Sequence, residues 1–281
     1  MSPLRVRPGT PGMVCILLST LGAPVSAQEG RPAATSINWE VGAPKAGWCI
    51  HFLMEPTTAT QDLARGYSLV PASDVSSLPS AIRGLITDEP QYATWTPAEL
   101  CTYVAEAIWV DGRRFDRGDG GRPIAVLYWG VSGASADDGG SDRGSRLSLR
   151  VVATNSSGLE RAMRARQVPI DRVDIDLLPV KESEEEEFLL KLEGATITFI
   201  GHARQDSTLT LADRSRKGAY MGNNRTLWTV DLSFEPGKVE ALSGALRITG
   251  KRGLAKALNR SPIRLLSPIL SEGKGTVTFN R

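Results

Sequence analysis

The stretch Pro123-Ile124-Ala125-Val126-Leu127-Tyr128-Trp129 is an unbroken apolar run between an arginine and a glycine. Its short length and its branched and aromatic side chains favour a buried β-strand over a helix. Residues 147–152 (Leu-Ser-Leu-Arg-Val-Val) alternate in part between apolar and polar side chains and predict a second strand. Both segments are therefore expected to form β-strands.

On the N-terminal side, residues 48–54 (Trp-Cys-Ile-His-Phe-Leu-Met) predict a strand that ends before Pro56. Between this strand and the central run, apolar residues recur at the spacing of a short helix. They are Leu78, Ile82, Leu85 and Ile86.

The segment Thr96-Pro97-Ala98-Glu99 has the residue types of a helix start. Threonine caps, proline fits the first helical position, and glutamate reaches back to the cap amide. We expect this helix to hold Cys101 in its first turns and to extend to about Ala105. A strand near residues 108–110, turned by Asp111-Gly112, is the alternative for the last part of this segment.

The C-terminal half has mostly strand patterns and one short helix at 254–258. Thr208–Leu211 is expected to pair back on the strand before it, and Pro236-Gly237 predicts a hairpin turn. The predicted strands cover 173–177, 195–203, 208–211, 227–234, 239–249 and 276–279. The fold class is accordingly mainly β with a few short helices, α+β in the N-terminal half, with a sandwich or barrel-like C-terminal half.

Three regions are expected along the chain. Residues 1–27 read as a signal peptide, residues 28–135 as an N-terminal α+β region, and residues 146–281 as a C-terminal β-rich domain. Residues 132–145 lack large apolar side chains and predict a flexible loop or linker. This loop joins either two domains or two strands of one hairpin.

The first 27 residues have the pattern of an export signal. Arg5 and Arg7 precede an apolar run of about 13 residues, which is shorter than the roughly 20 residues of a membrane-spanning helix. Val25-Ser26-Ala27 then offers a signal peptidase a small last residue with an aliphatic residue two positions before it. We expect cleavage after Ala27 and a periplasmic or extracellular protein that does not span a membrane.

Charge is distributed unevenly. Residues 28–193 hold 25 acidic and 17 basic residues, whereas residues 194–281 hold 6 acidic and 14 basic residues. The basic 194–281 segment suggests an acidic ligand or an envelope partner, and dispersal of these charges within one fold is the alternative. The balance after residue 27 is neutral, which argues against nucleic-acid binding.

Two cysteines follow the export signal, Cys49 and Cys101. In an oxidising compartment they are expected to form a disulfide bond. The alternative is a reactive Cys49 beside His51, since residues two apart on a strand share a face.

No motif supplies a catalytic, metal-binding or cofactor-binding site. Asp174 and Asp176 share a strand face, and two carboxylates are the minimum requirement of a glycosidase. Their neighbours Val173, Ile175 and Leu177 provide the core face, so these aspartates are expected to be solvated. No cofactor and no metal are expected.

Two functional hypotheses remain. The first is an exported, non-catalytic protein that acts as a binding, accessory or structural component of the envelope or extracellular space. The second is a secreted, glycosidase-like hydrolase whose carboxylates are brought together by the fold, with two buried carboxyl groups facing one cleft.

Overall fold

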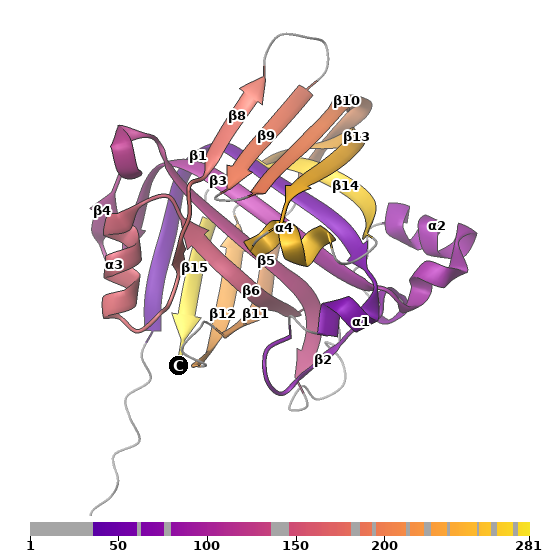
Figure 1. The fold of residues 1–281 in the computed structure, drawn as a ribbon, viewed down its shortest axis with the longest axis horizontal. Helices are drawn as coiled ribbons and strands as arrows, with labels where there is room; N and C mark the ends of the chain where they lie inside the picture. Colours follow the sequence, from indigo (N-terminus) through magenta and orange to yellow (C-terminus); the bar gives the residue numbers. More distant parts are fainter. Residues whose placement is uncertain are drawn as a thin grey trace, which may run out of the picture. The chain divides into compact units, whose positions relative to one another are not determined.

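A computed structural model gives the fold (Figure 1). It describes residues 36–60, 63–75, 80–135, 146–180, 186–192, 195–211, 214–221, 226–234, 237–251, 253–259, 263–271 and 275–281. The expected signal peptide of residues 1–27 lies outside these described residues. So do residues 136–145 of the expected flexible loop.

The described residues are mainly strand, as the sequence predicts. The strands are β1 (Ser36–Met54), β2 (Tyr67–Leu69), β3 (Thr96–Val110), β4 (Arg113–Phe115), β5 (Ile124–Ser135), β6 (Arg146–Thr154), β7 (Asp171–Arg172), β8 (Asp176–Val180), β9 (Glu186–Leu192), β10 (Ala195–Leu211), β11 (Arg214–Met221), β12 (Leu227–Phe234), β13 (Gly237–Gly250), β14 (Ile263–Ser271) and β15 (Gly275–Asn280). The α-helices are α1 (Pro56–Ala59), α2 (Ser80–Asp88), α3 (Ser157–Ala165) and α4 (Gly253–Asn259), with 3₁₀ turns at Ala72–Asp74, Pro90–Thr94 and Asp119–Gly121.

Seven strands, β5 among them, form a closed ring. Their order is β3-β5-β6-β11-β12-β15-β1, and β1 pairs with β3 to close the ring. Neighbouring strands are antiparallel except β6 and β11, which are parallel. The ring thus takes strands from both halves of the sequence, and the fold has the expected barrel-like character.

The inner face of the ring holds the larger part of the core. Trp39, Trp228 and Phe279 are buried there with Tyr220. Helix α3 contributes Leu159, Ala162 and Met163 to the same cluster. Aromatic residues at these strand positions therefore act as core anchors.

A second part of the sheet continues from the later half of β1 through β14, β13, β10 and β9 to β8. Ile197 of β10 packs with α4 residues Ala255 and Leu258. These side chains belong to one cluster with Ile50 and Leu100, which alternate with the inner-face residues of β1 and β3. Strands β1, β3 and β5 are therefore buried on both faces, which explains their apolar runs, whereas β12 alternates buried and exposed residues.

The predicted helix at Thr96 is wrong, because residues 96–110 form strand β3. Thr96 is completely buried and pairs with Met54 across the sheet. The local capping pattern is overridden because β3 lies between β1 and β5 and buries both of its faces. The alternative strand at 108–110 is correct, and Asp111-Gly112 turns it into β4 with φ values of 48° and 78°.

Three other local expectations also differ from the structure. Pro236-Gly237 does not join a hairpin, since β12 pairs with β11 and β15 whereas β13 pairs with β10 and β14. Residues 208–211 continue strand β10 and do not pair back. Residues 132–135 belong to β5, which pairs there with β2 and β6, and thus lie in a sheet rather than in a loop.

Helix α3 begins at a set of polar contacts around Asp119. The backbone N–H of Ser157 donates to Asp119 Oδ1 at 3.0 Å, and the Ser157 hydroxyl donates to the same oxygen at 2.9 Å. Arg172 Nε donates to Oδ2 at 2.6 Å. The pKa of Asp119 lies below its ordinary value, and the main cause is the hydrogen bond from the Ser157 backbone. Desolvation opposes this shift, whereas the hydrogen bonds from the Ser157 side chain and from Arg172 add to it.

Replacing Asp119 with asparagine should lower the free energy of unfolding at pH 7 by about 1–2 kcal/mol, because these charge-assisted bonds weaken. A carboxyl group with a depressed pKa stabilises the fold above its unfolded pKa and loses that effect as the pH falls through its folded pKa. The difference between Asp119→Asn and wild type should therefore shrink below about pH 3.8, the ordinary value. Urea denaturation at several pH values measures this difference in stability.

Asp116→Asn, at an exposed site, is the control and should change the free energy of unfolding by less than about 0.5 kcal/mol. Equal effects of Asp119→Asn and Asp116→Asn would contradict the account.

Candidate functional site

Cross-strand register aligns the candidate site in rows across β1, β3, β5 and β6. We define the Glu99 row as His51, Glu99, Gly130 and Leu149, which are successive partners across these strands. The next row, which we call the disulfide row, contains Cys49, Cys101, Tyr128 and Val152. Tyr103 and Val126 pair in the row after that.

A bulge keeps these rows on one face of the sheet. The register between β5 and β6 shifts between Trp129 and Gly130, so that Tyr128 lies opposite Val152 and Gly130 lies opposite Leu149. Without the extra residue, Leu149 and Val152 would point to opposite faces. Both are buried in the inner cluster of the ring, whereas Arg150 is exposed.

In the Glu99 row, the half-buried His51 lies beside the buried Glu99. Nδ1 of His51 lies 3.6 Å from Oε2 of Glu99, and the side chains are 20% and 4% exposed. Nε2 of His51 is shielded from solvent. Glu99 is the only buried Asp or Glu side chain in the part of the chain that the structure describes.

Such a pair is not explained by stability alone. Removing two ionisable groups from water is costly, and a buried pair is often no more stabilising than apolar side chains of similar volume. A buried carboxylate beside an imidazole is, on the other hand, a common arrangement for moving a proton. The Glu99 row therefore has the residue types of an acid–base site.

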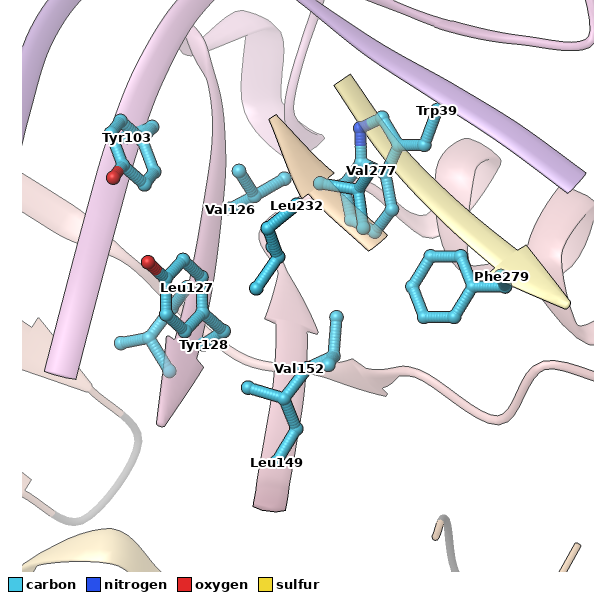
Figure 2. A pocket seen from close by; sticks show the side chains of 10 residues that line it. All are labelled: Trp39, Tyr103, Val126, Leu127, Tyr128, Leu149, Val152, Leu232, Val277 and Phe279. Carbon is cyan, nitrogen blue, oxygen red and sulfur yellow. The ribbon is translucent and has the colours of Figure 1, made fainter. Parts of the chain in front are cut away.

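A small apolar cavity lies next to this row, inside the ring. Its volume is about 30 Å³, and every lining atom that faces it is apolar. Figure 2 shows Tyr103 and Tyr128 on one side and Trp39 and Phe279 on the other, with Leu232 between them. Its remaining lining residues are Val126, Leu127, Leu149, Val152 and Val277.

The cavity and the pair share a wall. Leu149 lines the cavity and belongs to the Glu99 row, separated from Glu99 only by Gly130, which has no side chain. Tyr128 and Val152 line the cavity from the adjoining row. Residues of adjacent rows on one face are about 7 Å apart along a strand, so the pair lies within one or two side-chain lengths of the cavity.

Cys49 and Cys101 are joined by a disulfide bond across directly opposite positions of β1 and β3, with their Cα atoms 4.0 Å apart. Cys49 Sγ also lies 3.3 Å from the Tyr103 hydroxyl. The alternative of a reactive Cys49 beside His51 is therefore not what the structure contains. The imidazole of His51 is instead next to Glu99.

Of the two aspartates singled out in the sequence, the structure describes the side chain of Asp174 alone. Asp174 is exposed and pairs with Arg122. The side chain of Asp176 lies outside the described residues. The second hypothesis required two buried carboxyl groups facing one cleft, and the described ranges contain one buried carboxyl group, that of Glu99.

Glu99 is a candidate site residue that the sequence did not reveal. It was assigned to a helix cap, and only the strand assignment of β3 places it opposite His51. The sequence does contain a signal for this pair, because Glu99 lies two residues before Cys101 and His51 lies two residues after Cys49. An antiparallel strand pair with the two cysteines opposite each other necessarily places Glu99 opposite His51.

Another buried polar group lies where α3 and β7 approach β11. Tyr220 donates a hydrogen bond to the carbonyl of Pro169, and burial raises the pKa of this phenol, with a smaller contribution from Asp171. Desolvation likewise raises the pKa of Asp171. Neither residue lines the cavity, so this group is assigned to the packing of the fold.

The described residues hold no cluster of three or more metal-ligating side chains. Among them there is also no helix with the length and apolar character needed to cross a membrane.

Neither a protein-family model nor a curated protein sequence matches this chain. Solved structures do resemble it. The enduracididine biosynthesis enzyme MppR with HEPES buffer bound has a TM-score of 0.48 at 11% identity, covering 88% of this chain and 87% of that chain. An acetoacetate decarboxylase-like enzyme from Sphingomonas wittichii has 0.47 at 8%, covering 88% and 90%. An acetoacetate decarboxylase from Legionella pneumophila has 0.47 at 10%, covering 95% and 97%.

These three structures are enzymes, which contradicts the expectation of a non-catalytic binding, accessory or structural protein. We withdraw that expectation. Because each TM-score is below 0.5, nothing about substrate or mechanism is taken from them. The following proposal depends on the residues of the Glu99 row and the cavity.

Proposed function

We propose that this chain is an enzyme that transfers a proton to or from a small, uncharged substrate inside the ring. His51 exchanges the proton at Nε2, the imidazole nitrogen that does not face Glu99. Glu99, beside Nδ1, orients the ring and stabilises the imidazolium form. The observation that carries this proposal is the position of this pair in the same row as a wall of the apolar cavity.

The surroundings suit this chemistry. Apolar walls exclude water, which strengthens the interaction between the imidazolium and the carboxylate during the transfer. The disulfide row beside the pair contains a covalent link between β1 and β3, the two strands that carry His51 and Glu99. That link keeps the two side chains in register, as acid–base chemistry requires.

Two expectations from the sequence remain part of the proposal. Export after cleavage at Ala27 would place the enzyme in the periplasm or outside the cell, where the disulfide is stable. The basic 194–281 segment remains a candidate surface for an acidic or envelope partner. Neither is needed for the chemistry at His51.

Affinity labelling with 1-bromobutan-2-one tests the assignment of His51. The small α-halo ketone should enter the cavity and alkylate Nε2, forming an N–C bond as the C–Br bond breaks and bromide leaves. Peptide mass spectrometry should find the adduct on His51, and excess butan-2-one should slow its formation. Absence of a His51 adduct from the folded protein, or labelling that butan-2-one does not slow, would refute the proposal.

A further inference from the structure

We infer that the cavity selects its ligand by the length of a short apolar chain, so that the substrate is a small uncharged molecule with an apolar group of about two to four carbon atoms. This inference rests on the proposed function, since it places the reacting polar end of that molecule at the Glu99 row. It identifies the class of substrate that the proton-transfer site takes.

Volume sets the upper limit of the chain length. A single water molecule needs a cavity volume of about 10–15 Å³. The cavity volume of about 30 Å³ therefore leaves room for roughly two water-sized groups. The walls come from β1, β3, β5, β6, β12 and β15, which are strands of the closed ring. Close-packed interiors have low compressibility, so a chain that is too long clashes with the side chains of these strands.

The chemistry of the lining side chains determines which class of ligand the cavity can hold. The walls present aromatic rings and aliphatic groups and no polar atom, and cavities of this kind stay dry and accept apolar molecules. A charged group would lose its hydration there without a partner. His51 and Glu99 do not line the cavity, but they lie in the row that contributes its lining residue Leu149.

The direction of the ligand follows from these two features. Its apolar end lies among Trp39, Val277 and Phe279, which line the cavity from β1 and β15 (Figure 2). Its polar end lies toward Leu149 and Tyr128, the lining residues in or next to the Glu99 row. A short ketone fits this orientation, with its carbonyl carbon and the adjacent C–H bonds nearest His51.

Methyl ketones of increasing length provide the test. Acetone, butan-2-one, pentan-2-one, hexan-2-one and heptan-2-one are titrated into the full-length Glu99→Gln variant, and dissociation constants are read from methyl NMR shifts. Binding is thus measured without depending on turnover. Affinity should improve by about fourfold per added methylene until the cavity is filled and should fall for longer chains. The 4-oxopentanoate ion, which matches pentan-2-one in chain length but carries a carboxylate, should bind about 100-fold more weakly than pentan-2-one.

Substitutions at Val277, which lines the cavity and is only half-buried, assign the effect to this cavity. Val277→Ala should move the optimum to a longer ketone and Val277→Ile to a shorter one. Leu227→Ala removes a side chain that is 41% exposed and lies outside the cavity, and should leave the optimum unchanged.

Three results would overturn the inference: affinity that rises through heptan-2-one without an optimum, equal binding of 4-oxopentanoate, or an optimum that neither Val277 variant moves. If ketone affinity has an optimum chain length but proton transfer does not depend on His51, the proposed function is refuted. The inferred class of ligand is then retained. The ketone series in the Glu99→Gln variant shows an optimum or lacks one even if a Val277 variant does not fold.

Discussion

Replacing both Cys49 and Cys101 with alanine should lower the free energy of unfolding by about 4 kcal/mol. The bond closes a loop with a sequence separation of 52 residues, and in the chain-entropy model such a link stabilises by roughly this amount. Both cysteines are buried in the ring, so the loss of packing adds to the effect. For a domain with a typical stability of about 5–15 kcal/mol, the loss is large.

Urea denaturation measures this difference, and wild-type protein in a thiol reductant is the matched control. Reduced wild type should unfold close to the urea midpoint of the double variant, since both lack the same cross-link. The ring should still form, because β1 and β3 keep their backbone pairing over residues 39–54 and 96–110. A double variant as stable as the oxidised wild type would contradict the assigned stabilisation.

The class of the fold was predictable because strand signals here are strong. Residues 124–129 are an apolar run with branched and aromatic side chains, residues 147–152 alternate in part between apolar and polar side chains, and both form strands. The short helices near residues 80–88 and 253–259 also follow from apolar spacing. Closure of the ring was not predictable, because the β1–β3 and β6–β11 pairings join segments far apart in the sequence.

The error at Thr96 shows why the site was missed. Capping residues describe only the first turn, whereas the burial of both faces of residues 96–110 depends on the two neighbouring strands. With Glu99 placed in a helix, His51 had only Cys49 as a candidate partner. Two cysteines after residue 27 allow one intramolecular pair, but the pairing alone does not reveal that the linked segments are antiparallel strands.

The cavity was beyond sequence reasoning for a related reason. Its lining side chains come from six strands, and the bulge at Trp129/Gly130 decides that Leu149 and Val152 share a face. Apolar residues at strand positions are read as core in any sequence. Only the packed structure distinguishes a filled core from one with a small space beside an ionisable pair.

Glu99→Gln and His51→Gln should each reduce proton transfer by about 100-fold or more, the usual contribution of a positioned acid–base group. Glu99→Gln keeps the shape of the side chain and removes its charge, so the imidazolium formed during the transfer loses its counter-charge. His51→Gln removes the group that holds the proton. Glu106→Gln, at an exposed position on the same strand β3, is the matched control.

The most direct measurement is the exchange of the α-protons of butan-2-one in D₂O, followed by ¹H NMR. Wild type and Glu106→Gln should accelerate deuterium incorporation equally above the buffer rate, and the His51 and Glu99 variants should fall toward that rate while remaining folded by circular dichroism. Exchange no faster than in buffer with wild type, or exchange that survives His51→Gln unchanged, would contradict proton transfer inside the ring.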